Sequence, residues 1–125
     1  MKQIIVAFAL IGVVAVLMIW NGFYLTAVCG ELLDMCNKLP ENKQEFENLS
    51  PQQAEDILEK FKGNTVYMNL SLPFPEIREA DRAITDVISY IRTRNYDEYI
   101  AARARSILTL EILRGYEVPN IEHLL

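Results

Sequence analysis

Few residues of this 125-residue chain have side chains suited to catalysis, and they do not form a known motif. An enzyme needs a nucleophile beside a base, paired carboxylates or a metal cluster. His123 is the only histidine and stands two residues from the C-terminus, where a structural or solvent-facing role is the simpler interpretation. Neither an HExxH motif nor a glycine-rich phosphate loop is present. The sequence therefore predicts no enzyme, no cofactor and no metal site.

Two groups of charged residues are candidates for binding sites. Acids between positions 76 and 86 alternate with Arg78 and Arg82 at helical neighbour spacing, which is typical of a solvated, salt-bridged face. A basic cluster in the last third could bind an anion or an acidic partner. We expect the far member, Arg114, to lie at the other end of a helical hairpin, so that the cluster does not form one patch. Its members are Arg92, Arg94, Arg103, Arg105 and Arg114.

Cys29 and Cys36 are seven residues apart. On one helix they would share a face about 10 Å apart along the axis, too far for an internal disulfide. The simpler interpretation is two small residues on a packing seam. The alternative is an intermolecular disulfide in a dimer, because residues at this spacing meet their copies across a parallel pair of helices. Without a CxxC motif or a nearby histidine, zinc is not expected.

The element that positions everything else is the apolar N-terminal run. Residues 4–20 contain no charged side chain, and after Asn21 and Gly22 the run resumes up to Val28. A helix of this length can cross a hydrocarbon core of roughly 30 Å and satisfies its own backbone there. We predict a membrane span from Ile4 to Val28, with Trp20 and Tyr24 near the lipid–water boundary.

Charge predicts the orientation of this span. Lys2 precedes it, whereas the first charges after it are Glu31 and Asp34, which favours the N-terminus in the cytoplasm and the C-terminal domain outside. Two alternatives remain open. A signal peptide could be cleaved near residues 28–30, or Cys29 could be lipidated, although Val28 is not the small residue that lipoprotein processing requires.

The net charge of −5 argues against nucleic acid as a partner, since nucleic acids select basic surfaces. The expected partners are the lipid bilayer and either a second copy of the chain or another membrane protein.

Past the span, helical spacing predicts that the first helix continues as a stalk until Pro40, followed by a stretch that is either more stalk or a connector. Ser50 and Pro51 predict the start of a second helix that ends at Gly63. Residues 63–74 alternate like a strand but have no partner, so we expect an irregular or short helical connector.

The last two long helices should form an antiparallel hairpin, because only residues 93–95 separate them. A short C-terminal piece, residues 118–125, is expected to fold back on it. The predicted hairpin core consists of Ile77, Ile84, Val87, Ile88, Ile91, Ile100, Ala104, Ile107 and Leu108, with Ala101 and Ile112 on the same predicted stripe.

The predicted fold class is therefore all-α. A transmembrane anchor (residues 1–28) continues into a helical stalk and connector (29–49), and a three- to four-helix extracytoplasmic bundle follows (50–125).

The second half of the chain resembles a bacterial family known as domain of unknown function 4363. The resemblance rests on the order of short features: Glu76-Ile77 opening a helix, the run from Ile84 to Ile91, residues 95–98 (NYDE) at the next helix start, and Asn120-Ile121 near the end. The chain departs from the pattern at Phe74-Pro75, where a histidine is expected, and it lacks a tryptophan in the connector. The resemblance implies a membrane-anchored small helical protein, but it implies no activity and no functional residues.

The function expected from these features is that of a single-pass protein of a bacterial cytoplasmic membrane, acting as a binding, scaffolding or accessory component. The alternatives are a secreted or lipid-anchored domain and a small extracytoplasmic enzyme subunit.

Overall fold

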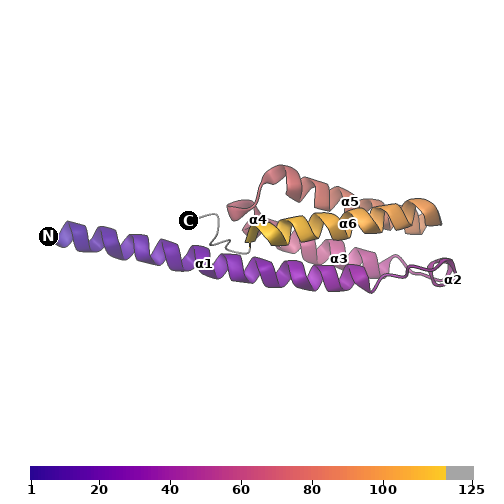
Figure 1. Cartoon of the computed structure of the whole chain (residues 1–125), viewed down its shortest axis with the longest axis horizontal. Coiled ribbons are helices and arrows are strands. Elements are labelled where there is room, and N and C mark those ends of the chain that lie inside the picture. Colours follow the sequence, from indigo (N-terminus) through magenta and orange to yellow (C-terminus); the bar gives the residue numbers. More distant parts are fainter. Residues whose placement is uncertain (118–125) are drawn as a thin grey trace.

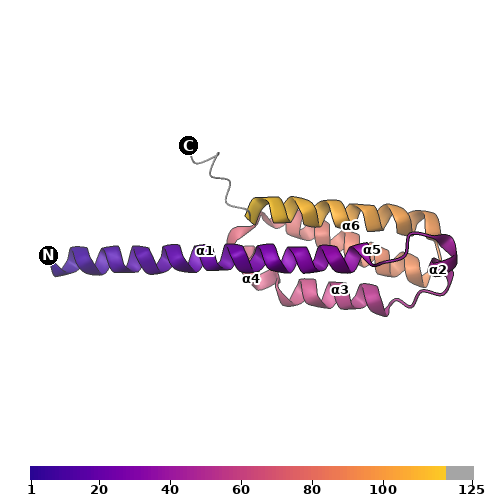
Figure 2. The ribbon, with the colours of Figure 1, turned by 60° about the horizontal axis from the view of Figure 1, so that its bottom comes forward.

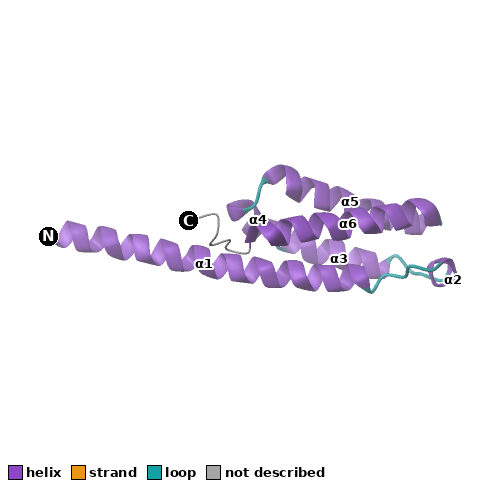
Figure 3. Cartoon of the chain, viewed as in Figure 1, coloured by secondary structure: helices purple, strands orange, loops and turns teal. Residues whose placement is uncertain are grey.

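The computed structural model describes residues 1–117, and this part of the chain is built from helices without a strand (Figure 3). The all-α class predicted from the sequence is confirmed. The helices are α1 (Lys2–Asn37), α2 (Lys43–Glu47), α3 (Gln52–Gly63), α4 (Thr65–Ser71), α5 (Phe74–Arg92) and α6 (Tyr96–Glu117). The C-terminal piece that we expected to fold back on the hairpin, including His123, lies outside the described residues.

Helix α1 has 36 residues, and its two halves have different surroundings. Residues 1–20 are exposed along their whole length, and they project beyond the other helices (Figures 1 and 2). From Leu25 onward one face of α1 is buried. By length and composition alone α1 is long and apolar enough to cross a membrane, which confirms the predicted long apolar helix at the N-terminus.

The second half of α1 lies side by side with α3 and α6, and α5 lies on the far side of the bundle (Figures 1 and 2). Helix α6 packs against α5 and α1, and α3 packs against α5 and α1. Their common core contains side chains with less than a tenth of their surface exposed, among them Leu25, Leu32, Cys36, Ile57, Phe61, Ile84, Ile91, Tyr99, Leu110 and Leu113. The buried faces of α3, α5, α6 and the second half of α1 therefore meet in one core.

This packing changes the interpretation of the segment after residue 28. Val28, which we placed in the membrane span, is only 5% exposed and belongs to the core, as does Leu25. Residues 29–37, expected to be a stalk, are instead part of a bundle helix, because Leu32, Leu33 and Cys36 are buried against α6 and α3. The helix ends close to Pro40 as predicted, and the remaining stretch to residue 49 is a connector that contains the short helix α2.

The hairpin of α5 and α6 has the expected buried face on α5 but a different one on α6. Ile77, Ile84, Val87, Ile88 and Ile91 are all buried, as the pattern of this helix predicts. Ala104 and Leu108 are exposed, Leu108 by 57%, and Ile100 and Ile107 are only partly buried.

The buried face of α6 differs from the predicted one because apolar residues lie on several sides of this helix. Tyr99, Ala102, Leu110 and Leu113 fill the core, accompanied by the polar residues Arg103 and Ser106. The predicted stripe that included Ala101, Ala104, Leu108 and Ile112 is therefore wrong, since all four are exposed.

Two connectors form as their residue types require. Asn42 caps α2 by accepting a hydrogen bond from the Glu45 backbone N–H at 2.8 Å, and the Ser50 hydroxyl accepts one from the Gln52 N–H at 3.2 Å ahead of α3. The segment between α3 and α5 contains the seven-residue helix α4, so the helical one of the two expected conformations is confirmed.

Candidate functional site

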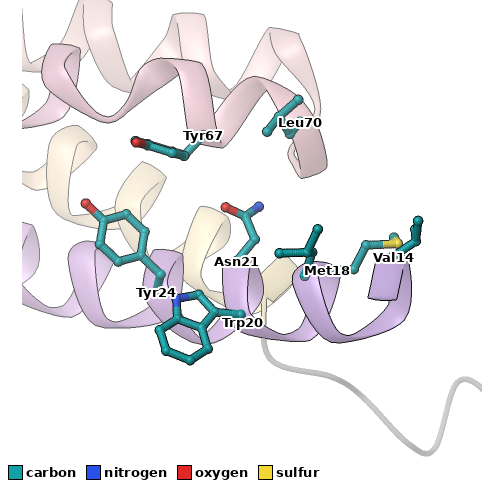
Figure 4. Close-up of a pocket in the computed structure, with 8 residues that line it drawn as sticks. Val14, Met18, Trp20, Asn21, Tyr24, Tyr67 and Leu70 are labelled. Atoms are coloured by element: carbon teal, nitrogen blue, oxygen red, sulfur yellow. The ribbon is translucent and has the colours of Figure 1, made fainter. Parts of the chain in front are cut away.

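A cleft of about 750 Å³ lies between α1 and α4, where α1 leaves the bundle (Figure 4). Helix α4 forms one wall and α1 the other. The lining is apolar or aromatic except for the half-buried Asn21 and the tyrosine hydroxyls: it consists of Val14, Leu17, Met18, Trp20, Asn21, Tyr24, Tyr67 and Leu70. Such a cleft is suited to an apolar ligand, because polar side chains that could orient a hydrophilic one are few.

Helix α4 is held against α1 by a set of polar and aromatic contacts. The Tyr24 hydroxyl donates a hydrogen bond to the Asn64 side-chain oxygen at 2.7 Å, and the Asn64 amide nitrogen donates to the Lys60 carbonyl at 2.8 Å. The Tyr67 ring packs edge-on against the Tyr24 ring, with 5.6 Å between centroids. These contacts fix the width of the cleft at the end nearer the bundle.

The surface of α4 is apolar on opposite sides. Met68 and Leu72 point into the bundle and are 0% and 6% exposed. Val66 and Leu70 point away from it and are 70% and 75% exposed, and Phe74 at the start of α5 is 60% exposed. Helix α4 therefore buries one apolar side in the bundle and leaves apolar side chains exposed on the other.

The opposite end of the bundle is held by Arg103, which is only 8% exposed. Its guanidinium donates hydrogen bonds to the Leu39 and Asn37 carbonyls, both at 3.2 Å, and forms an ion pair with Glu41 at 3.0 Å. The last carbonyls of a helix lack partners within the helix and carry partial negative charge. Arg103 therefore satisfies the C-terminal end of α1 and fixes it to α6.

A second arginine ties the next connector to the turn between α5 and α6. Arg94 has a positive φ of 56°, which turns its backbone between the two helices. Its guanidinium donates to the carbonyls of Phe46 at 3.1 Å and Leu49 at 2.7 Å. Phe46 is buried against the Tyr99 ring, with a centroid separation of 4.6 Å. These contacts place α2 over the end of the hairpin.

Two other arginines of the basic cluster form ion pairs with carboxylates of the bundle. Arg92 pairs with Glu55 and Arg105 with Asp86. Arg114 lies near the C-terminal end of α6, far along the helix from the turn, as expected. The anion site considered from the sequence is therefore not assembled, because the other four arginines bind carbonyls and carboxylates of the protein itself and Arg114 is remote from them.

Burial changes the acidity of two core groups near Arg103. Desolvation raises the pKa of the Cys36 thiol to about 11, although the nearby Arg103 charge opposes the shift. Desolvation likewise raises the pKa of the Tyr99 hydroxyl to about 12, again opposed by Arg103. The Tyr99 hydroxyl keeps its proton and donates a hydrogen bond to the Pro40 carbonyl at 2.7 Å.

The cysteines occupy the packing seam rather than an exposed face. Cys29 and Cys36 are 0% and 1% exposed, and both belong to the common core of the bundle. A thiol must reach the surface to meet a second chain, so the intermolecular disulfide considered from the sequence would require this seam to open. Within residues 1–117, no group of three or more His, Cys, Asp or Glu is placed to hold a metal ion.

Sequence reasoning did not find the cleft. Trp20 and Tyr24 were expected at a lipid boundary, but Tyr67 and Leu70 were assigned only to a connector. The signal that was available is the charge-free stretch from residue 64 to residue 75, which follows the charged end of α3.

No family model matches this chain, and no curated protein or solved structure is significantly similar to it. The resemblance to the domain of unknown function 4363 family stays a prediction.

Proposed function

We propose that this chain is a single-pass membrane protein whose helical bundle stands on the outer face of a cytoplasmic membrane and acts by binding rather than by catalysis. In this proposal residues 2–20 cross the bilayer, and the bundle that follows lies on its outer side or at its surface.

The observation that carries the proposal is the contrast between the two halves of α1. Residues 1–20 bury nothing, although nearly all are apolar, and large side chains such as Phe8, Leu17 and Trp20 are more than 60% exposed. An apolar surface of this extent is not stable in water. The exposed part from residue 2 to residue 20 is about 28 Å long at 1.5 Å per residue, close to the hydrocarbon thickness of a bilayer.

The burial of Cys29 supports retention of the anchor. Cleavage near residues 28–30 would remove Leu25 and Val28, which are 0% and 5% exposed, from the core of the bundle. Lipidation of Cys29 would have to modify a side chain with no exposed surface. A secreted or lipid-anchored form would therefore lack part of the packing described above.

The binding role is supported by the way the described polar groups are used. Arg94 and Arg103 bind backbone carbonyls, while Arg92 and Arg105 pair with carboxylates. Their contacts stabilise the fold, and the Thr85 hydroxyl that donates to the Asp81 carboxylate at 3.2 Å does so across one turn of α5, on an exposed surface. A small enzyme subunit is the alternative that this argument disfavours.

Membrane insertion is tested with a double variant of the full chain, Leu10→Arg with Val13→Arg. Two arginines at the centre of a span add roughly 5–7 kcal/mol to its insertion free energy, comparable to what a dozen apolar residues contribute. We expect alkaline carbonate washing to leave the wild-type protein in the membrane pellet and to release the double variant. The matched control is Gln53→Arg, on the exposed side of α3, which should stay in the pellet. Release of the wild-type protein would refute the span.

Orientation is tested separately with C-terminal reporter fusions. An alkaline phosphatase fusion should be active and a green fluorescent protein fusion dark, because the first folds only outside the cytoplasm and the second only inside. The reverse result would refute the proposed orientation while leaving the span intact.

The binding role is tested by crosslinking in intact cells followed by mass spectrometry. A reproducible protein partner, or a crosslinked pair of this chain, supports a scaffolding or accessory role. A chain that is recovered only as an uncrosslinked monomer contradicts it.

A further inference from the structure

We propose that the cleft between α1 and α4 is a lipid-binding site that takes an acyl chain of a bilayer phospholipid, and that α4 lies in the membrane interface. This inference rests on the proposed membrane span of residues 2–20. It adds that the bundle does not stand clear of the bilayer but is seated in its outer leaflet.

The first argument is the composition of α4 on its exposed side. Val66, Leu70 and Phe74 leave most of their surface uncovered, although the bundle has other apolar residues well buried. No residue from 64 to 75 carries a charge. Interfacial helices share this property on the face that enters the acyl region. The exposed side of α4 is therefore suited to hydrocarbon rather than to water.

The second argument is where α4 sits along α1. The cleft residues contributed by α1 begin at Val14 and end at Tyr24, and they span the point where α1 leaves the bundle (Figure 4). If residues 2–20 fill the hydrocarbon core, the outer end of that core falls at Trp20 and Asn21. Helix α4 is then at the depth of the lipid–water boundary, where Trp20, Tyr24 and Tyr67 have aromatic rings suited to it.

The third argument is the continuity of the apolar surface. Val14, Leu17 and Met18 line the cleft and also belong to the exposed apolar surface of α1, with exposed fractions of 54–68%. An acyl chain beside α1 can therefore extend into the cleft without crossing a polar surface. The volume of about 750 Å³ is large enough for part of a chain, and the walls offer it mainly apolar and aromatic contacts.

The fourth argument is the distribution of charge around the bundle. Lys62 precedes the charge-free stretch and Glu76 follows it, and Arg78, two residues further on, lies over the Phe74 ring at 5.7 Å. Basic side chains beside an apolar surface suit the boundary with phospholipid headgroups. The opposite end of the bundle instead has a charged connector, with Glu41, Lys43, Glu45 and Glu47, as expected of a surface in water.

The experiment uses quenching of tryptophan fluorescence by brominated lipids in reconstituted vesicles. Trp20 is the only tryptophan of the chain and stands at the outer end of the proposed span, where it also lines the cleft, so the wild-type protein reports on the depth of this point of α1 in the bilayer. A variant with Trp20→Phe and Leu70→Trp reports on the cleft instead. Leu70 is 75% exposed, which leaves room for the larger ring. The matched control has Trp20→Phe with Gln44→Trp, on the exposed side of α2 at the far end.

The vesicles contain phosphatidylethanolamine and phosphatidylglycerol, with acyl chains that are either brominated or not. We expect the tryptophan at position 70 to lose fluorescence in brominated vesicles about as strongly as Trp20 does in the wild-type protein. The tryptophan at position 44 should keep its intensity.

The outcomes separate this inference from the proposed function. If Trp20 is quenched but the tryptophan at position 70 is not, the span stands and the lipid site is refuted. The lipid site is also refuted if the emission of the tryptophan at position 70 is blue-shifted but not quenched. Such emission would show an apolar surrounding without lipid, as when a second copy of the chain covers the cleft. If Trp20 itself is not quenched, both proposals fail.

Discussion

Replacement of Arg103 by methionine is expected to destabilise the bundle strongly, because the carbonyls that it binds stay behind. The Asn37 and Leu39 carbonyls would lose their charged donor, and the methionine side chain would fill a similar volume without replacing it. Hydrogen bonds from a charged group contribute about 1.5–3 kcal/mol each. The cost of burying the guanidinium offsets part of this gain, so we expect a net loss of about 3 kcal/mol.

The assay is thermal unfolding of the full-length protein in detergent micelles, followed by circular dichroism. A loss of about 3 kcal/mol should lower the Tm by roughly 12–24 °C for a domain of this size. The matched control is Arg105→Met on the same helix, whose ion pair with Asp86 is half exposed. Such pairs contribute at most about 1 kcal/mol, so its Tm should fall by no more than about 8 °C.

Arg103→Lys provides a graded test of the same reasoning. Lysine keeps the charge, but a single ammonium group cannot reproduce the two directions in which the guanidinium donates. Its Tm should lie between those of the wild-type protein and Arg103→Met. If Arg103→Met melts together with Arg105→Met, Arg103 does not stabilise the end of α1 and the reasoning is refuted.

Three further predictions concern the core. Folding raises the pKa of the Cys36 thiol to about 11 from an ordinary value of 9.0, so the folded state binds this proton more tightly. The free energy of unfolding should therefore fall as pH rises from about 9 to 11. The Tm of Cys36→Ala should fall less steeply over that range, and the same slope of Tm against pH in both proteins would contradict the burial of the thiol. Cys29 and Cys36 should react with maleimide only after denaturation, and rapid labelling of the native protein would show that the seam is open. Ile84→Asp should unfold the bundle because it buries an unpaired charge. Leu108→Asp, at a position that is 57% exposed, should change the Tm by a few degrees at most. If both variants lower the Tm equally in thermal melts, the orientation of α6 described here is wrong.

The sequence predicted the helices well wherever local signals mark their ends. Pro40 lies just past the end of α1, Ser50 and Pro51 precede α3, and the short turn between α5 and α6 forces these helices to be neighbours. Each of these signals acts through the backbone within a few residues, so no knowledge of the packing is needed to recognise it.

The buried face of α6 could not be predicted in the same way. Leu108 and Ile112 lie on one side and Leu110 and Leu113 on another, so counting apolar residues does not select a face. The buried side also carries Arg103, whose burial depends on carbonyls some sixty residues earlier in the chain. Only the folded structure brings these groups together.

The point at which α1 enters the bundle could not be predicted from the sequence for a related reason, and neither could the cleft beside it. Nothing in the composition of residues 4–28 separates the side chains that are exposed from those that are buried in the bundle, since both are apolar. The cleft depends on Tyr67 reaching Tyr24 from a distant part of the chain, a contact that a local pattern cannot indicate.

Because α1 has no break between Lys2 and Asn37, its exposed apolar half and its bundle half form one continuous helix. No linker separates the two halves at the point where α1 leaves the bundle. If residues 2–20 cross a bilayer as proposed, a change in their tilt or rotation moves α3, α5 and α6 with them. Under that proposal, mechanical signals pass between the bilayer and the bundle without any helix having to unfold.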